Sequence, residues 1–203
     1  MTDKFKDLNG VLLAGHIKIT DPESGEVLID KRNAIHYENM SIALAESLAN
    51  AGQGPIYKMA FGNGGTSVDP TGIITYLTPN STGTNASLYN QTFNKVVDDQ
   101  ASNNTDPVRN KIETRHVSGT NYTDILVSCL LDYGEPSGQD AFDTTTNTEN
   151  LYVFDELGLI SAGASGTDGR LLTHVIFHPV QKSLNRLIQI DYTVRVQSLT
   201  GFN

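Results

Sequence analysis

Apolar and polar residues alternate most regularly near the end of the chain, over residues 187–197. In an extended strand, successive side chains point to opposite faces. One face of this segment would carry Ile188, Ile190, Tyr192, Val194 and Val196, and the other Gln189, Asp191, Thr193 and Arg195. The alternation therefore predicts a strand with one face on a core and the other toward solvent or a partner.

Two hairpins are indicated by pairs of apolar segments that a short polar stretch connects. Residues 15–20 and 26–31 flank a loop with proline and glycine, which suits a hairpin. Residues 151–160 and 170–178 flank a glycine-rich turn. Both patterns predict antiparallel strand pairs.

One helix is predicted between residues 39 and 50. Asn39 and Ser41 are the candidates for its N-cap, and Asn50-Ala51-Gly52 would end it. Apolar residues recur at helical spacing and build a stripe of Met40, Ile42, Leu44, Ala45, Leu48 and Ala49. A stripe this wide predicts that the helix packs on a sheet.

Strands and long loops alternate in the rest of the chain. Further strands are expected at residues 56–61, 88–97, 111–117 and 122–131. The stretches between them are rich in Gly, Thr, Ser, Asn and Asp, and three of them are long: 66–87, 98–110 and 132–148. Loops of this length are uncommon unless they have a function or contact a partner.

The predicted fold is mainly β, an antiparallel β-sandwich with one short helix in its N-terminal half and long ordered loops. Residues 1–14 are expected to form an irregular N-terminal arm, and residues 15–203 a single β-rich domain. The arm and residues 66–87 and 132–148 have few apolar side chains to offset their ordering entropy. We therefore expect these three segments to become ordered only against neighbouring subunits.

Composition narrows the possible partners. The chain has 203 residues, of which 38% are apolar, and its formal net charge is −9. Such a charge argues against contact with the phosphate backbone of nucleic acid. No apolar run approaches the ~18 residues that cross a bilayer, and residues 1–10 lack the apolar part of a secretion signal. We therefore expect neither nucleic acid nor membrane among the partners, and synthesis in a cytoplasm.

Residues with catalytic or metal-binding potential form no recognisable site. Cys129 lies in the apolar run 125–131, which predicts a buried and unreactive thiol. His174 and His178 lie on a predicted strand, where residues four apart are ~13 Å apart, too far to share a metal. The sequence contains neither a Gly-x-Ser-x-Gly elbow nor a phosphate-binding loop. It thus predicts no catalytic, cofactor-binding or metal-binding residues and no cofactor.

Carboxylates need separate consideration, because a glycosidase requires only two. Asp155 and Glu156 are adjacent on a predicted strand, so we expect them to point to opposite faces and not to flank one glycosidic bond. Glu156 is expected to bond nearby backbone or loop groups. The loop carboxylates Asp98, Asp99, Asp132, Glu135, Asp140 and Asp143 are interpreted as solvated charge, with Ca²⁺ binding as the alternative.

Three stretches are similar to segments of tailed-phage virion structural proteins, including N-terminal and adaptor modules of tail fibres. The first is Asp30–Tyr37 (DKRNAIHY), which leads into the predicted helix. The second is Tyr57–Thr66 (YKMAFGNGGT), a strand followed by a glycine-rich turn. The third is Phe154–Ile160 (FDELGLI) with Gly169–Leu172, which resembles a hairpin of phage fibre and collar proteins. The loops at 67–87 and 132–148 are longer than a minimal fibre module requires, and no trimerising shaft follows Asn203, so a standalone particle component is expected.

The resemblance implies a non-enzymatic structural component of the virion, in the tail, the neck or collar, the baseplate or a fibre attachment. It implies assembly in the host cytoplasm, other virion proteins as partners, and a homo-oligomer in a symmetric ring or trimer. One alternative is a head-decoration or glycan-binding protein of the particle surface, and another is a polysaccharide hydrolase. The expected contact residues are Phe5, Leu8, Leu12, Gly62, Asn63, Gly64 and Gly65.

Overall fold

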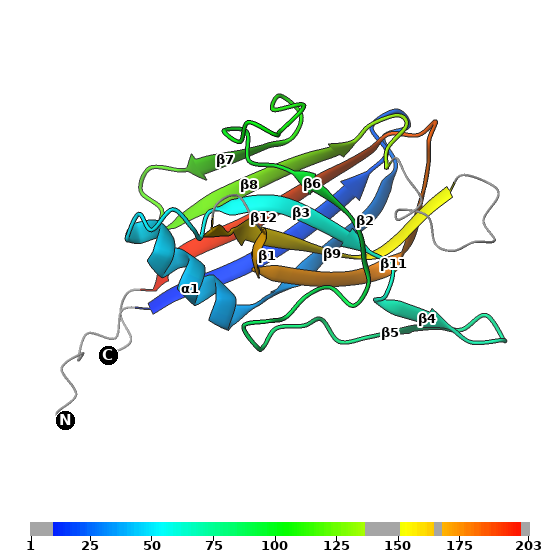
Figure 1. Ribbon diagram of the computed structural model, residues 1–203, viewed down its shortest axis with the longest axis horizontal. Coiled ribbons are helices and arrows are strands. Elements are labelled where there is room, and N and C mark those ends of the chain that lie inside the picture. Colours follow the sequence, from blue (N-terminus) through cyan, green and yellow to red (C-terminus); the bar gives the residue numbers. More distant parts are fainter. Residues whose placement is uncertain (1–9, 137–150, 165–167, 200–203) are drawn as a thin grey trace.

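The computed structural model describes residues 10–136, 151–164 and 168–199. In this part of the chain, strands follow one another with a single α-helix among them (Figure 1). The elements are β1 (Gly10–Thr20), β2 (Val27–Ile35), α1 (Tyr37–Leu48), β3 (Ile56–Gly62), β4 (Thr66–Val68), β5 (Ile74–Tyr76), β6 (Gln91–Val96), β7 (Lys111–His116), β8 (Tyr122–Leu131), β9 (Leu151–Ala162), β10 (Asp168–Leu171), β11 (Thr173–Ser183) and β12 (Ile188–Leu199). The prediction of a mainly β, antiparallel fold with one short helix is confirmed.

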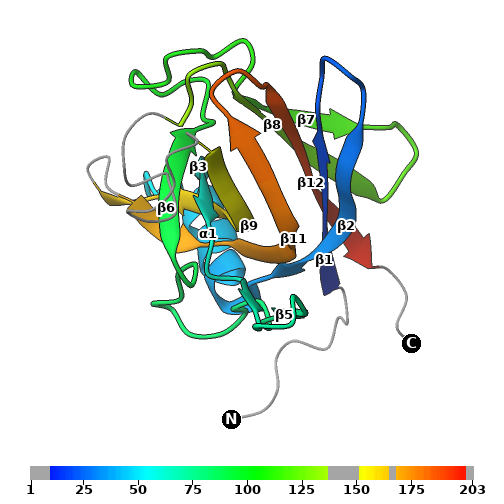
Figure 2. The ribbon, with the colours of Figure 1, turned by 90° about the vertical axis from the view of Figure 1, so that its right-hand side faces the viewer.

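Most of the strands form one ten-stranded antiparallel sheet. Across it the order is β6-β3-β9-β11-β2-β1-β12-β8-β7, and β10 pairs with β9. The sheet curls on itself, so that β6, β3, β9 and β11 face the layer formed by β2, β1, β12, β8 and β7 (Figure 2). The layers are joined where β11 pairs with β2, at Thr173–Ile35 and His174–Ala34. The short strands β4 and β5 pair only with each other and form a separate hairpin.

The inner faces of the two layers make one apolar core. β12 buries Ile188, Ile190, Tyr192 and Val194 and leaves Asp191 exposed, so the predicted alternation is confirmed. The opposite layer contributes aromatic rings, among them Phe61 and Phe154, whose centroids are 5.5 Å apart in an edge-to-face arrangement. Cys129 is fully buried in this core, and burial raises the pKa of its thiol to about 12, as expected of an unreactive cysteine.

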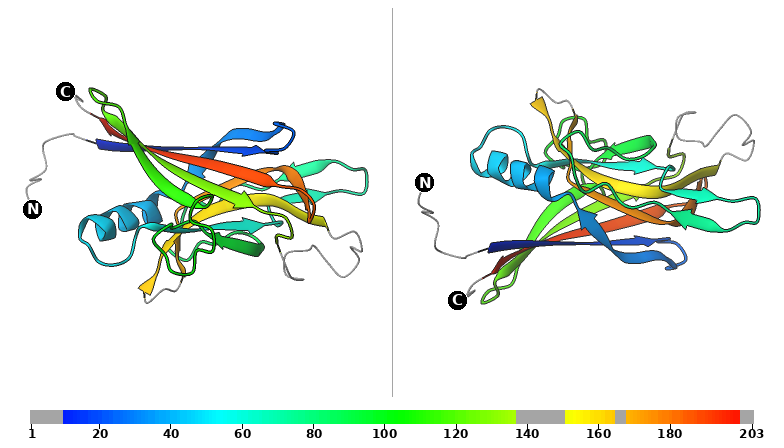
Figure 3. Two further views of the ribbon diagram at one scale, coloured as in Figure 1. Left: turned by 90° about the horizontal axis from the view of Figure 1, so that it is seen from above. Right: turned by 90° about the horizontal axis from the view of Figure 1, so that it is seen from below.

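The helix begins two residues earlier than predicted because a histidine caps it. The Nδ1 atom of His36 accepts a hydrogen bond from the Asn39 amide at 3.2 Å, so the prediction of Asn39 or Ser41 as N-cap is wrong. Asn50, with φ of 51°, follows the helix in the left-handed conformation, at the predicted stop. Met40 and Ala43 are buried, whereas Leu48 is 89% exposed. Only part of the predicted stripe is covered, because α1 lies at one end of the layers (Figure 3).

The boundary of the predicted N-terminal arm is corrected by the structure. Residues 10–14 belong to β1, and the ladder between β1 and β12 starts at Gly10 opposite Leu199. Since β12 offers a partner along the whole of β1, these residues satisfy their backbone hydrogen bonds in the sheet. Leu12 lies on β1 with 46% of its surface exposed. Phe5 and Leu8 lie outside the described residues.

Candidate functional site

The glycine-rich turn after β3 lies against two buried carboxylates of β9. The amides of Gly65 and Thr66 donate to Asp155 at 2.9 Å each. The amide of Gly64 donates to Oε1 of Glu156 at 3.1 Å. A Cβ atom at Gly62 would lie 2.4 Å from Oε1 of Glu156, so glycine at this position lets the carboxylate reach the turn.

The expectation that Asp155 and Glu156 point to opposite faces is corrected, because both contact the same turn. In the ladder of β9 with β11, Ile176 pairs with Glu156 but Val180 pairs with Phe154. Asp155 therefore faces an irregular stretch of β11, residues 177–179, and the strict alternation of faces is lost there. Pro179 lies inside β11 at this irregularity, beyond the predicted strand end at residue 178, since a missing N–H is tolerated at a bulge.

Every acceptor position of the Glu156 carboxylate is occupied. Oε1 accepts the amides of Gly64 and Asn90, and Oε2 accepts the amide of Tyr89 and Nε2 of His174, the last two at 2.9 Å each. Nδ1 of His174 accepts the Asn80 amide at 2.8 Å, which places the ring proton on Nε2. The prediction that Glu156 bonds backbone and loop groups is confirmed.

The pKa values of the two carboxylates shift in opposite directions because their hydrogen bonding differs. Burial raises the pKa of Glu156, but the hydrogen bonds from His174 and three backbone amides outweigh burial and hold the pKa below its usual value of 4.5. Burial also raises the pKa of Asp155, and there the hydrogen bonds from Thr66 and Gly65 do not compensate. Each oxygen of Glu156 thus accepts two hydrogen bonds, and both ring nitrogens of His174 are engaged in hydrogen bonds.

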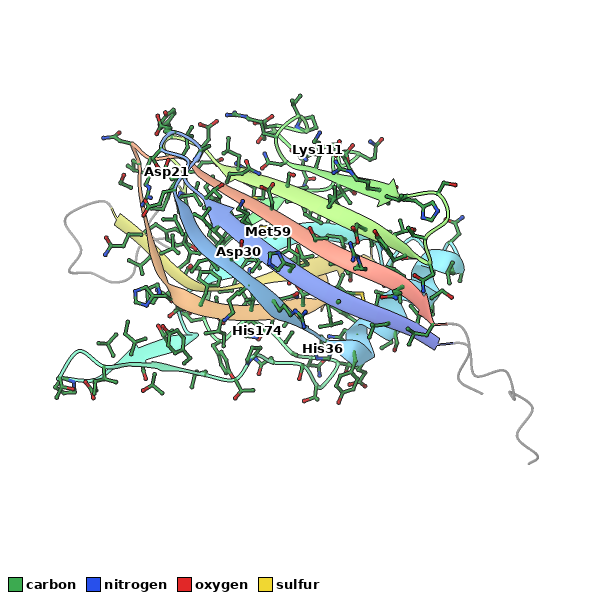
Figure 4. The ribbon with its side chains drawn as sticks, turned by 180° about the vertical axis from the view of Figure 1, so that it is seen from behind. Asp21, Asp30, His36, Met59, Lys111 and His174 are labelled. Carbon is green, nitrogen blue, oxygen red and sulfur yellow. The ribbon has the colours of Figure 1, made fainter. Side chains whose placement is uncertain are left out.

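Asp155, Glu156 and His174, which we call the polar cluster, connect the β4–β5 hairpin (residues 66–76) and the segment after it to the rest of the domain. Thr66 is held by Asp155, and the Leu77 amide donates to the Gly65 carbonyl at 2.9 Å. The hydroxyl of Tyr76 lies 3.2 Å from Nδ1 of His178. His174 lies next to the segment that follows β5 (Figure 4). The expectation that residues 66–87 are ordered only against neighbours is therefore wrong at the base of this segment.

The β4–β5 hairpin itself projects from the body (Figure 1). It exposes apolar side chains. Because Val68 pairs with Ile74 and Ser67 with Thr75, the side chains of Val68, Ile74 and Tyr76 lie on one face of the hairpin, and those of Ser67, Thr75 and Ile73 on the other. Four large apolar residues are exposed on it and directly after it: Val68 by 61%, Ile73 by 63%, Tyr76 by 50% and Leu77 by 42%. The tip is ordered by Asp69, whose carboxylate accepts the amides of Thr71 and Ile73.

A second apolar surface is a partly open cleft of about 310 Å³ beneath the helix, which we call the α1 cleft. Its walls come from α1, from the layer of β1, β12 and β8, and from the edge strand β7; they include Met40, Leu44, Leu13, Val194, Ile125 and Ile112. β7 ends the sheet order, so no further strand covers the core beside it. Asp98 alone carries a charge among the described residues that line the cleft.

Several residues predicted to contact other subunits form hydrogen bonds within the chain instead. Gly64 and Gly65, expected to contact other subunits, give their amides to Glu156 and Asp155, and the amide of Asn63 donates to the carbonyl of Asn90. Val68, Ile73 and the residues of the α1 cleft are not among the predicted contact residues. The only signal for the hairpin is that Val68, Ile74 and Tyr76 recur every second residue on either side of a polar turn.

The acidic loop residues bond within the chain where the structure describes them. Asp98 and Asp99 accept hydrogen bonds from Gln100. Asp132 pairs with Arg109, and Glu135 pairs with Lys95. Asp140 and Asp143 lie outside the described residues. In the described part of the chain, no group of three or more His, Cys, Asp or Glu side chains is arranged to hold a metal ion.

Comparison with known proteins does not assign this chain to a family or a known fold. No protein-family model, no curated protein and no solved structure matches this chain. Within residues 10–136, 151–164 and 168–199, none of the helical structure has the length and apolar character needed to span a bilayer. The function is therefore inferred from the surfaces described above and from the three stretches of similar sequence.

Proposed function

We propose that this chain is a non-enzymatic structural component of a tailed-phage virion that acts through contacts with neighbouring subunits. The virion part of the proposal rests on the three stretches at 30–37, 57–66 and 154–172. The subunit-contact part rests on one observation, the β4–β5 hairpin, which projects from the body with Val68 and Ile73 more than half exposed. The tail, the neck or collar, the baseplate and a fibre attachment are the places in the particle that fit this role.

The β4–β5 hairpin suits binding because it is ordered before a partner arrives. An isolated two-stranded hairpin is marginally stable in water. Here Asp155 holds the first strand at Gly65 and Thr66, and Asp69 holds the tip. A surface that is already ordered loses less conformational entropy on binding. Exposed apolar side chains on such a surface are typical of protein–protein contacts.

The buried polar cluster supports a structural role over catalysis. A general base needs a free lone pair within reach of its substrate. Glu156 and His174 are both fully buried, and their acceptor atoms are occupied by amides and by each other. This arrangement fixes loops in place and leaves neither Glu156 nor His174 free to transfer a proton.

The virion part of the proposal predicts that the chain is found in assembled particles. Antibody labelling of intact particles, followed by electron microscopy, should place the chain at the tail, neck, baseplate or fibre attachment in a fixed number of copies. Label on the head would favour the decoration alternative. Particles that lack the chain, with the chain left in the soluble fraction of the lysate, would contradict the proposal.

The non-enzymatic part predicts that the purified chain neither cleaves host polysaccharide nor needs a metal to fold. Reducing-end release from capsule or lipopolysaccharide should stay at the level of a protein-free control. Thermal unfolding should be the same with and without a strong chelator. Turnover above that control would contradict the first half, and loss of structure on chelation would contradict the second.

A further inference from the structure

We propose that His36 is an acid-sensitive cap of α1: it holds the first turn of the helix at neutral pH, and it releases α1 from the rest of the domain as the pH falls through the range in which histidine gains a proton. The proposal concerns a conformational change within one chain. It therefore stands or falls separately from the proposed function.

The hydrogen bond that caps α1 fixes the position of the proton on the neutral His36 ring. His36 lies where β2 passes into α1 (Figure 4). Its Nδ1 atom accepts from the Asn39 amide at 3.2 Å, so Nδ1 carries no hydrogen and the single ring proton is on Nε2. A second proton can bind only at Nδ1, where it would face the N–H group of Asn39. Protonation of the ring and capping of the helix therefore exclude each other.

The surroundings of His36 disfavour a positive charge. The side chain is fully buried, and a buried charge is costly unless it is paired. The N-terminus of a helix carries partial positive charge, which repels a cation. Within the described residues, no group accepts a hydrogen bond from Nε2, so no carboxylate is placed to stabilise an imidazolium. The closed helix thus requires the neutral ring.

The charged and titratable groups on the elements around His36 are engaged elsewhere. On each element, those closest to His36 in the fold or in sequence are Tyr37 and Glu38 on α1, Arg32 on β2, Arg170 on β10 and His174 on β11. Tyr37 is 64% exposed, and Arg32 is exposed on β2 opposite His16. Glu38 accepts the Gly83 amide, and Arg170 pairs with Glu46. In the described part of the chain, none of them bonds the His36 ring.

His174 differs from His36 in the compensation that a charged ring would find. His174 is equally buried, and its Nδ1 atom also accepts a backbone amide, that of Asn80. Its Nε2 atom, however, lies 2.9 Å from Oε2 of Glu156, so an imidazolium there would have a carboxylate beside it. Of the two buried histidines, His36 is the one whose charge would be uncompensated.

Loss of the cap would free α1 and uncover apolar surface. Met40 and Ala43 of α1 are buried in the same core as Leu172 and Val194. The other polar contacts of α1 include Nδ2 of Asn39 with the Leu171 carbonyl and the pair of Glu46 with Arg170. Neither involves a histidine, and carboxylates ordinarily keep their charge above about pH 5. His36 is therefore the group that makes the closure of α1 sensitive to mild acid.

The size of the effect follows from the difference in bound protons. In the opened helix His36 is solvated and gains a proton near pH ~6.5, whereas in the closed helix it does not. The opened state thus binds more protons, so a falling pH favours it. Between pH 7 and pH 5.5, the equilibrium constant for opening of α1 should rise by about tenfold.

Amide hydrogen exchange of the full chain at pH 7 and pH 5.5, corrected for the intrinsic effect of pH on exchange, tests the proposal. Protection of the α1 amides should fall by about tenfold in the wild type. His36→Asn keeps a cap, since asparagine is among the preferred N-cap residues, but cannot take the proton. In this variant the α1 amides should be equally protected at both pH values. His116→Asn, at an exposed histidine of β7, is the matched control and should respond like the wild type.

NMR of the ring nitrogens in the wild type supplies a readout that needs no variant. At pH 7 the Nδ1 atom of His36 should have the shift of a nitrogen without hydrogen, and Nε2 that of a nitrogen with one. At pH 5.5 this pattern should persist in the closed state, while the exposed His116 becomes charged.

Three outcomes would overturn the proposal: α1 protection that is the same at both pH values in the wild type, an equal loss of protection in His36→Asn, or a His36 ring that becomes charged while α1 stays protected. If His36→Asn does not fold, the exchange and the ring spectra of the wild type decide between these outcomes. None of the results bears on the presence of the chain in particles, which the labelling experiment tests.

Discussion

Replacing Glu156 by glutamine is expected to destabilise the fold severely, although the two side chains have nearly the same shape. The carboxylate accepts four hydrogen bonds, two at each oxygen, and all four donors point at it from fixed positions. A glutamine amide group would turn an NH₂ toward two of these donors. Flipping the amide only changes which pair is affected, and His174 cannot adapt because the Asn80 amide occupies its Nδ1.

Each buried donor left without an acceptor costs ~1–3 kcal/mol, so two of them consume much of a stability of ~5–15 kcal/mol. Urea unfolding followed by circular dichroism should show this loss. Glu113→Gln on β7 is the control, because Glu113 is exposed and its ion pair with Lys111 contributes at most ~1 kcal/mol. If both variants unfold at the same urea concentration, the polar cluster does not hold the fold together.

Glu156→Gln should also make the stability of the fold less dependent on pH in the acidic range. The pKa of Glu156 is lower in the folded chain than its usual value of 4.5, so ionised Glu156 favours the folded state. This contribution is complete above about pH 4.5 and is lost as the pH falls through the lower folded value. Asp155 has a raised pKa and acts in the opposite direction, but it remains in both proteins. The difference in stability between wild type and Glu156→Gln should therefore shrink below pH 4.5.

Ile190→Asp is expected to leave the chain unfolded. Ile190 is fully buried in the middle of β12, opposite Ile19 of β1 on one side and Cys129 of β8 on the other. An aspartate there would have no partner for its charge, and burying a charge without a partner costs several kcal/mol. Tyr192→Asp, two residues along the same face, should have the same effect.

The neighbouring outward-facing positions supply the controls. Asp191 is exposed, and Thr193 lies on the same outward face of β12. Asp191→Ala and Thr193→Ala should both stay folded, with melting temperatures within a few degrees of the wild type. Thermal unfolding of all four variants, followed by circular dichroism, tests which face of β12 is buried. Equal melting curves would mean that the face assignment of β12 is wrong.

The local pattern of apolar and polar residues predicts those strands of which one face is buried in the core and the other is not. β12 alternates because one face lies on the core, and the hairpin of β1 and β2 was visible from its turn and its alternating isoleucines. The cap of α1 is not evident from the sequence, because histidine is not a frequent capping residue.

The polar cluster could not be derived from spacing. Alternation placed Asp155 and Glu156 on opposite faces, and that rule fails where the ladder with β11 changes register. The amides that saturate Glu156 come from Gly64, Tyr89 and Asn90, far away in sequence. The α1 cleft depends in the same way on long-range order, because it exists only where β7 ends the sheet and α1 covers the remaining gap.

The pairing of β1 with β12 has a consequence for the synthesis of the protein. All eleven residues of β1 pair with β12, so two neighbouring strands in the middle of the sheet come from nearly opposite ends of the described chain. On the ribosome, β1 is made first but has to wait for β12 to emerge before the layer can close. Contacts this distant in sequence make folding slow. During that interval β1 displays an unpaired edge, the kind of surface on which nascent chains aggregate, and a chaperone or a dilute supply of new chains would protect it.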